Sequence, residues 1–253
     1  MIDIFQKVKG RLIVSCQAEE GSPFNSPEGV GAFAQCAAQG GAAGIRSCGI
    51  EKTDYLIRHS RLPVIGLTKS HFADGFVRIT GSFKEVEALM AIDTPLIAVD
   101  GTFRLRENGL TGPEYIRKIK ERYDGIKIMS DISTVDEAIA CREAGADCVS
   151  TTLCGYTPYT MKETKHGPSL EILRNCVKAL PDCPVFAEGR YNTPVEAARG
   201  IENGAWAVVV GSAITRPHLI TQWFSDTLAW VNAKFLQASN RFRSLGDCRA
   251  TLA

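Results

Sequence analysis

Short apolar runs alternate with helical segments eight times along the chain, and this alternation is the strongest constraint on the fold. The apolar runs, interpreted as strands, are residues 11–17, 43–47, 63–69, 95–101, 126–131, 148–152, 184–188 and 207–210. They are continuous apolar runs, as expected for parallel strands buried on both faces. Units of roughly 30 residues in a chain of 253 residues predict a single-domain α/β protein, a (β/α)8 TIM barrel. A doubly wound open sheet is the competing architecture, but the even repeats favour the closed barrel.

Local signals mark several of the helices and the end of the domain. Thr134 and Glu137 form a capping box that begins one helix. The loop over 153–167 is long, and loops of this length in a compact domain are usually functional. The last predicted helix, about 218–236, is rich in aromatic residues, which either complete the core or contact a second subunit. We therefore expect a catalytic barrel over 1–236, a poorly ordered C-terminal extension over 237–253, and a homodimer.

The charge balance excludes several classes of protein. The formal net charge is +1, so there is no basic surface in bulk to attract nucleic acid or an anionic membrane. No apolar run reaches the roughly 18 residues that a membrane span requires. The first ten residues are too polar for a signal peptide. We expect a cytoplasmic protein whose partner is a small molecule.

The nine cysteines are scattered and form no Cys-x-x-Cys pair, so a structural zinc site and dithiol redox chemistry are not predicted. Their apolar surroundings are typical of reduced core residues in a cytoplasmic protein. Cys16, Cys48 and Cys154 lie near predicted strand ends, where a reactive thiol could lie. A small buried hydrophobe is nevertheless the favoured interpretation of each.

Polar residues collect at the carboxyl ends of the predicted strands, where barrel enzymes carry their chemistry. One residue from each end gives Gln17, Arg46, Lys69, Asp100, Asp131, Thr152, Glu188 and Ser212. Singly, each has a simpler interpretation: Arg46 as an ion-pair partner of Asp131 or Glu188, and Asp100 as a cap for its own loop. Together they favour a site, because burying so many polar groups without a task would be destabilising.

Lys69 and Glu188 are the pair best suited to proton transfer. With Arg46 nearby, the charged form of Lys69 would be disfavoured, so that Lys69 could act as a base near neutral pH. Lys69 could instead form a Schiff base. None of the four histidines, at positions 59, 71, 166 and 218, falls at a strand end, so a His-rich metal site is not predicted. Asp100, Asp131 and Glu188 could hold Mg²⁺ without histidine.

Residues 186–217 contain two strand ends of similar form. Each apolar run ends in Gly plus a polar residue, and a proline soon opens a helix, at Pro194 and Pro217. Such ends, side by side above helix N-termini, favour anion binding. In (β/α)8 barrels the loops after strands 7 and 8 form the usual phosphate site. Gly189 and Gly211 would let the backbone turn tightly and approach such a ligand.

At these positions the chain resembles the N-acetylmannosamine-6-phosphate 2-epimerases. The matching motifs, in chain order, are Ser15-Cys16-Gln17, Ile45-Arg46, Gly66-Leu-Thr-Lys69, Val77-Arg-Ile-Thr80, Ile97-Ala-Val-Asp-Gly-Thr102, Ser130-Asp131, Thr151-Thr-Leu-Cys-Gly-Tyr-Thr157, Ala187-Glu-Gly-Arg-Tyr-Asn-Thr-Pro194 and Gly204-Ala-Trp-Ala-Val-Val-Val-Gly-Ser-Ala-Ile-Thr-Arg216. They cover nearly the whole predicted barrel, and the motif ending at Pro194 is highly specific.

The resemblance implies an epimerase of sialic acid and aminosugar catabolism that inverts C2 of N-acetylmannosamine 6-phosphate, giving N-acetylglucosamine 6-phosphate without a cofactor. It implies that Lys69 and Glu188 are catalytic. It also implies that Gln17 and Arg46 stabilise the oxyanion and that Asp131 contacts the sugar. The phosphate-binding residues that it implies are Gly189, Arg190, Gly211, Ser212 and Arg216. Thr152 is a further candidate for binding substrate. The rival hypotheses are a Schiff-base lyase or synthase on another phosphorylated substrate, and a sugar-phosphate-binding barrel without catalysis.

Overall fold

A computed structural model of the chain describes residues 3–106, 108–161 and 167–250. Eight parallel strands close into a barrel in the order β1-β10-β9-β8-β7-β6-β3-β2. The predicted (β/α)8 fold is therefore confirmed, and the open sheet is excluded. The barrel strands are β1 (Leu12–Ser15), β2 (Gly44–Cys48), β3 (Val64–Leu67), β6 (Leu96–Asp100), β7 (Ile128–Asp131), β8 (Cys148–Ser150), β9 (Val185–Glu188) and β10 (Ala207–Val210).

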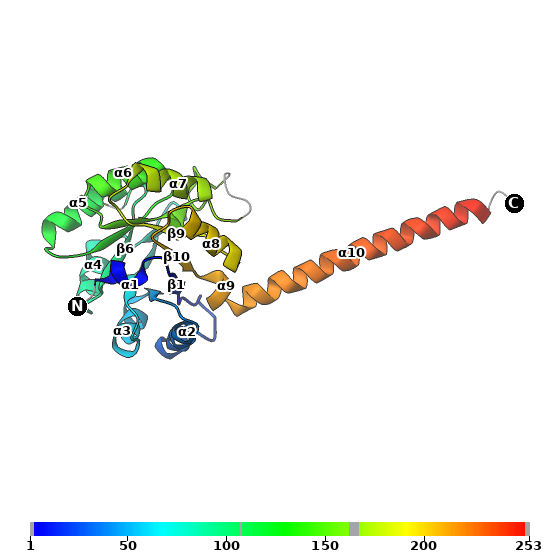
Figure 1. Cartoon of the computed structure of the whole chain (residues 1–253), viewed down its shortest axis with the longest axis horizontal. Coiled ribbons are helices and arrows are strands. Elements are labelled where there is room, and N and C mark those ends of the chain that lie inside the picture. The colour runs from blue at the N-terminus through cyan, green and yellow to red at the C-terminus, as the bar shows by residue number, and fades with distance from the viewer. Residues whose placement is uncertain (1–2, 107, 162–166, 251–253) are drawn as a thin grey trace. The chain divides into compact units, whose positions relative to one another are not determined.

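Helices cover the outside of the barrel, as Figure 1 shows. They are α2 (Pro27–Gln39), α3 (Ile50–His59), α4 (Phe83–Met90), α5 (Gly112–Arg122), α6 (Val135–Glu143), α7 (Leu170–Ala179), α8 (Pro194–Glu202) and the single turn α9 (Ser212–Thr215). Capping boxes begin four of them, at Ser82, Thr111, Thr134 and Thr193. The sequence therefore specifies these starting points locally, because each box satisfies free N–H groups at the helix end.

The strands bury both faces, as their continuous apolar pattern predicts. Ile13 packs with Leu67 and Phe186 in one cluster, whereas the adjacent Val14 packs with Val30 and Leu56 of the helices in another. Consecutive side chains on a strand point to opposite faces, so the first cluster fills the barrel and the second lies between strands and helices. Two packed layers result, and together they hold the strand ends in fixed positions.

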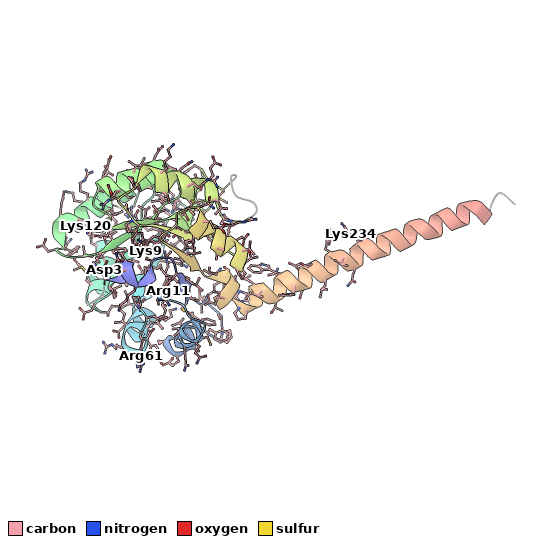
Figure 2. The ribbon with its side chains drawn as sticks, in the orientation of Figure 1. Asp3, Lys9, Arg11, Arg61, Lys120 and Lys234 are labelled. Atoms are coloured by element: carbon pink, nitrogen blue, oxygen red, sulfur yellow. The ribbon has the colours of Figure 1, made fainter. Side chains whose placement is uncertain are left out.

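A short helix, α1 (Ile4–Val8), joins the core inside the barrel through Ile4 and Val8. The indole Nε1 of Trp206 donates to the carbonyl of Phe5 at 2.8 Å, and Lys9 lies over the Trp206 ring at 4.3 Å. Lys9 and Asp3, at the two ends of this helix, are labelled in Figure 2. The amino-terminal segment therefore packs against residues next to the strands' beginnings and leaves their carboxyl ends available for a site.

One element departs from the simple repeat. Lys69 was expected at the end of the third barrel strand, but that strand ends at Leu67, and Lys69 begins a separate strand, β4 (Lys69–His71). β4 pairs antiparallel with β5 (Val77–Ile79), a strand that was not among the eight predicted. The two strands form a separate hairpin, so Lys69 lies outside the eight-stranded barrel sheet.

Residues 216–253 form a second compact unit, separate in its internal contacts from 1–215. It contains one helix, α10 (Pro217–Ala250), which does not end near Leu236 as predicted but continues without a break. Phe224, Leu228 and Trp230 are exposed on it. The boundary at 236 thus falls inside a helix. That residues 237–253 form a poorly ordered extension stays a prediction.

Candidate active site

An arginine with two carboxylates forms the centre of the site. Arg46, from β2, makes two contacts with Asp131 of β7, Nη1 to Oδ1 at 3.0 Å and Nη2 to Oδ2 at 2.5 Å. Its Nη1 also lies 2.7 Å from Oε2 of Glu188 on β9. Asp131 and Arg46 are buried, whereas the Glu188 side chain keeps 12% of its exposure. The barrel thus brings three charged groups together from strands far apart in the sequence.

Hydroxyl groups complete this cluster. Thr152 Oγ1 lies 2.7 Å from Asp131 Oδ1 and 3.1 Å from Glu188 Oε2, so its single proton can serve either carboxylate. Thr152 lies on the short turn Thr151–Leu153, just beyond β8. Ser150 Oγ contacts Thr152 Oγ1 at 2.9 Å. Ser150 was not among the predicted site residues; it ends β8 (Cys148–Ser150), two residues before Thr152.

The electrostatics of the cluster favour a protonatable Glu188. Burial raises the pKa of Glu188 to about 7, against the lowering effect of Arg46, and the neighbouring Asp131 carboxylate raises it further. One guanidinium cannot fully compensate two buried carboxylates, so one of them holds a proton most easily. Glu188 is the more exposed of the two. It is therefore suited to gain and lose a proton near neutral pH.

Lys69 and Gln17 form a second group at the mouth. The Lys69 ammonium donates to Oε1 of Gln17 at 2.8 Å, and Nε2 of Gln17 donates to Oγ of Ser15 at 2.9 Å. The positive charge of Lys69 lowers the pKa of Glu188 and so acts against the effect of burial. Lys69 is exposed. Arg46 was expected to disfavour the charged form of Lys69. In the structure, however, the charge of Arg46 is paired with the carboxylates of Asp131 and Glu188.

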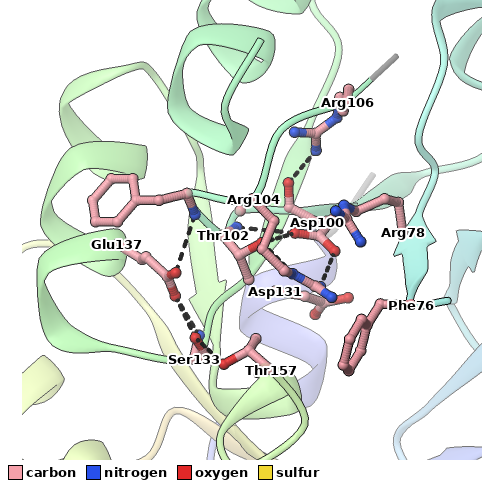
Figure 3. A network of polar contacts seen from close by, with 12 residues as sticks. Phe76, Arg78, Asp100, Thr102, Arg104, Arg106, Asp131, Ser133, Glu137 and Thr157 are labelled. Carbon is pink, nitrogen blue, oxygen red and sulfur yellow. Dashed lines mark hydrogen bonds and ion pairs between the residues drawn. The ribbon is translucent and has the colours of Figure 1, made fainter. Parts of the chain in front are cut away.

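Asp100 does not join the central cluster. Its Oδ1 accepts from the backbone N–H of Thr102 at 3.0 Å and from Thr102 Oγ1 at 2.6 Å, and its Oδ2 accepts from Arg104 at 2.7 Å. Figure 3 shows these contacts, with the side chain turned toward its own loop. The simpler interpretation, a cap for the following loop, is the correct one. Among the described residues, no three carboxylate, His or Cys side chains are grouped to hold a metal ion, so the placement of Asp100, Asp131 and Glu188 does not support a magnesium site.

The predicted phosphate-binding residues follow two neighbouring strands. β9 and β10 pair directly, and Gly189 and Gly211 come immediately after them. Gly189 has φ of 101°, a left-handed conformation that a side chain would strain. Gly211 has no positive φ. Ser212 begins α9, whereas Arg216 opens the second unit. The phosphate assignment stays a prediction for all of these residues.

Arg190 has another use in this structure. Its Nη1 donates to the carbonyl of Cys154 at 2.8 Å and its Nη2 to the carbonyl of Gly155 at 2.9 Å. The guanidinium also lies over the ring of Tyr156, 4.1 Å from its centre. Because both Nη atoms are engaged, the side chain ties the end of β9 to the long loop after β8. Its predicted role in binding phosphate is untested.

That long loop is held at several points. Tyr159 donates its hydroxyl to Oε1 of the buried Glu137, which also accepts from the backbone N–H of Phe103 at 3.1 Å. Within the loop, Thr157 and Thr160 share a contact of 2.6 Å between their hydroxyl oxygens. Residues 162–166, including His166, lie outside the described part of the loop. The described part is thus anchored to α6 and to the loop after β6.

The cysteines near the strand ends are not activated. Burial raises the pKa of Cys16 to about 12 and also raises that of Cys48. Cys154 is buried. A thiol whose pKa is raised by burial is a poor nucleophile. The interpretation of these residues as small packed side chains is therefore supported.

Comparison with known proteins gives a consistent result. The family model described as "Putative N-acetylmannosamine-6-phosphate epimerase" matches residues 30–229. A protein of Clostridioides difficile with the same description, as a 2-epimerase, is 48% identical over 87% of this chain and 97% of its own. One of Clostridium perfringens is 42% identical over 90% of this chain and all of its own.

Solved structures agree. The structure of the N-acetylmannosamine-6-phosphate 2-epimerase from Clostridium perfringens has a TM-score of 0.82 and 40% identity, covering 89% of this chain and 96% of that one. A thiamine phosphate pyrophosphorylase from Pyrococcus furiosus, with a TM-score of 0.58, 17% identity and coverage of 84% and 90%, shares the fold alone. In the part of the chain that the structure describes, no helix has the length and apolar character to span a membrane. With its barrel, its charged mouth and these relatives, the chain belongs to the N-acetylmannosamine-6-phosphate epimerase family.

Proposed function

We propose that the protein inverts C2 of N-acetylmannosamine 6-phosphate to give N-acetylglucosamine 6-phosphate, a step of sialic acid and aminosugar catabolism. Relatives described as 2-epimerases for this sugar phosphate support the substrate. The observation that carries the proposal is the Glu188 carboxylate, which bonds Arg46 at 2.7 Å and whose pKa is raised by burial to about 7, against the lowering effect of the nearby Lys69 charge. Two proton carriers around one carbon are what an inversion by proton transfer requires.

The chemistry follows from the open-chain sugar, in which C1 is an aldehyde next to C2. One base removes the C2 proton, and the electron pair moves onto the C1 oxygen to form an enediolate-like anion. A proton then returns to C2 on the opposite face, and the aldehyde re-forms. Lys69 and Glu188 carry these protons. Each serves as base in one direction of the reaction and as acid in the other.

The remaining groups of the mouth act on the anion and the sugar. Arg46 and Gln17 stabilise the developing negative charge on oxygen, which is usually the largest contribution to such a reaction. Asp131 and Thr152 hold sugar hydroxyl groups and assist ring opening. Arg46 already pairs with Asp131 and Glu188. Its guanidinium is therefore fixed before the substrate arrives, and little reorganisation is needed during the reaction.

The phosphate is assigned to the loops after β9 and β10. Backbone N–H groups near Gly189, Gly211 and Ser212 contact its oxygens, and Arg216 supplies charge through a bidentate contact. Arg190 contributes by holding the adjacent loop, in keeping with its contacts to Cys154 and Gly155. We expect Arg216→Ala to raise KM roughly tenfold or more with a smaller effect on kcat, measured by steady-state kinetics. An unchanged KM would remove Arg216 from this role.

Proton NMR in D₂O tests the proposed reaction. The enzyme is incubated with N-acetylmannosamine 6-phosphate, without added metal or nucleotide. Appearance of N-acetylglucosamine 6-phosphate carrying deuterium at C2 is the expected result, because protons held by Lys69 and Glu188 exchange with solvent. Absence of conversion would contradict the substrate assignment. Loss of activity on borohydride treatment, only in the presence of substrate, would favour a Schiff base at Lys69.

The assembly and location are part of the same proposal. Phe224, Leu228 and Trp230 expose large apolar surfaces on α10, and a homodimer is the simplest arrangement that covers such surfaces. The protein acts in the cytoplasm, where amino sugar phosphates are metabolised. Sedimentation equilibrium tests the dimer, and a monomer at micromolar concentration would contradict it.

A further inference from the structure

Four helices of the barrel begin with a capping box, but the glutamates of these boxes do not all make the same contacts. In each, a glutamate three residues after the N-cap accepts from the cap residue: Glu85, Glu114, Glu137 and Glu196. Glu114 accepts through Oε2 from the N–H and hydroxyl of Thr111, at 2.8 and 2.7 Å. Glu196 bonds Asn192 and Thr193, next to its own helix. For these two glutamates the contacts are those of a helix cap.

Glu85 divides its two oxygens between two tasks. Oε2 accepts from the N–H and the hydroxyl of Ser82, both at 2.8 Å, and so caps α4. Oε1 accepts from the hydroxyls of Thr68 and Ser70, both at 2.6 Å. Although burial alone would raise the pKa of Glu85, these hydrogen bonds lower it, so the carboxylate is charged at neutral pH. Thr68 and Ser70 flank Lys69, and nothing in helix capping requires them.

The geometry of a strand connects these two contacts to Lys69. Alternate side chains of a strand point to opposite faces. When Glu85 holds Thr68 and Ser70 on one face, Lys69 between them must point to the other, where it meets Gln17 at 2.8 Å. The backbone is fixed from the opposite edge by Ile79, the ladder partner of Lys69, and by a contact of 3.2 Å from the Thr68 N–H to Thr80 Oγ1.

We infer that Glu85 is a positioning residue for the reaction, which aims the Lys69 ammonium into the mouth by holding the hydroxyls of Thr68 and Ser70. The inference rests on the proposed function, because it assigns Glu85 to the proton carrier of that reaction. Lys69 needs such support, since it lies on a short hairpin outside the barrel ladder. A reacting group displaced by about 1 Å can cost about a hundredfold in rate.

Hydroxyl variants separate positioning from capping, because they leave the Oε2 contacts intact. The double variant Thr68→Val with Ser70→Ala removes both donors to Oε1. We expect kcat to fall about 10- to 100-fold with KM little changed, and Thr68→Ser, which keeps a hydroxyl, to retain most of the activity. Glu85→Gln is expected to fall similarly. Glu114→Gln weakens a matched cap at α5 and is expected to keep wild-type kcat.

Two kinetic outcomes would overturn the inference. One is wild-type kcat in the double variant, and the other is an equal loss in Glu114→Gln, which would assign the effect to capping. Amide hydrogen exchange over residues 68–80 gives a second measurement that does not depend on turnover. Faster exchange there in the double variant, but not in Glu114→Gln, is expected, and unchanged exchange contradicts the inference. If the wild-type protein fails to convert the sugar phosphate, the proposed function fails, while exchange still decides whether Glu85 fixes the hairpin.

Discussion

Two aspartates end neighbouring strands of this barrel, and each is buried against an arginine, but the two pairs differ in origin. Asp100 of β6 and Asp131 of β7 are partners in the strand register. Asp100 takes its arginine, Arg104, from four residues further along its own loop. Asp131 pairs with Arg46 of β2, a strand that does not neighbour β7 in the barrel. One pair is therefore local in sequence, and the other exists only when the barrel is closed.

The charge around the two pairs also differs. Near Asp100, Arg106 donates to the main-chain carbonyl of the same residue and Arg104 to its carboxylate, so cations outnumber carboxylates. Near Asp131, a second carboxylate, Glu188, shares Arg46, so carboxylates outnumber cations. Excess cations around a single carboxylate hold a loop. Excess carboxylates around one cation leave a group that can exchange a proton near neutral pH. The ion pair at the end of β6 thus stabilises a loop, whereas the one at the end of the adjacent β7 belongs to a group that can exchange a proton.

The largest expected effect is a loss of kcat when a proton carrier beside the Arg46–Asp131 pair is removed. Replacing Lys69 by Ala removes one carrier, and general acid–base contributions of this kind amount to about 10²–10⁴-fold in rate. We expect kcat to fall by that factor in steady-state assays, with the melting temperature unchanged because Lys69 is exposed. Full activity in Lys69→Ala would refute its role as a proton carrier.

The local pair is expected to respond in the opposite way. Asp100→Asn leaves the buried Arg104 without its carboxylate, and breaking a buried ion pair from one side costs about 3–5 kcal/mol. Chemical denaturation is expected to show this loss, while kcat per folded molecule at low temperature stays near the wild-type value. If kcat falls as far as in Lys69→Ala while the free energy of unfolding is unchanged, the contrast between the two pairs is wrong.

A smaller effect is expected in the dependence of stability on pH. Because burial raises the pKa of Glu188 from its ordinary value of 4.5 to about 7, the folded protein keeps a proton that the unfolded chain has lost. Stability contributed by this group is complete below about pH 4.5 and is lost as pH rises toward 7. The change is on the order of 1–3 kcal/mol. Denaturant titrations of the wild type and Glu188→Gln at several pH values measure it, and parallel pH profiles would contradict the assignment.

The smallest effect concerns the loop beside the sites. Tyr159→Phe removes the hydroxyl that donates to the buried Glu137. Because Tyr159 is exposed, the loss is expected to be about 1.5 kcal/mol, the low end for a bond to a charged group. We expect a modest fall in melting temperature and faster proteolysis near residue 159. Since Glu137 keeps its contacts with Ser133 and Thr134, the cap of α6 remains. A loss above 4 kcal/mol, well beyond the expected range, would show that the loop has a larger structural role.

The regular fold follows from the sequence because its signals are local. Continuous apolar runs mark the strands and capping boxes mark the starts of four helices, and both signals are visible within a few residues. The central cluster was found only as a set of strand ends, since the sequence cannot show that Arg46 bonds both Asp131 and Glu188 rather than one. Asp100 was included wrongly in the predicted gathering at the mouth, because an aspartate that caps its own loop has the same spacing as one that faces the barrel axis.

Two further features of the structure could not be predicted from the sequence. The strand that carries Lys69 is defined by pairing with Val77–Ile79, and an interruption after Leu67 has no apolar signature. The helix α10 also continues beyond Leu236, past the aromatic-rich segment from which its extent was predicted. A capping-box search would have found Glu85 beside Ser82, but not its contacts with Thr68 and Ser70, which depend on the hairpin.

Carbon-13 NMR of the glutamate carboxyl groups, followed over pH and assigned with Glu188→Gln, tests the central claim most directly. The account predicts that the resonance missing in Glu188→Gln titrates with a midpoint near pH 7, because burial beside Asp131 outweighs the attraction of Arg46. A midpoint at the ordinary value of about 4.5 would contradict the account. Glu188 would then be ionised throughout the neutral range, and a proton held there could not take part in the inversion.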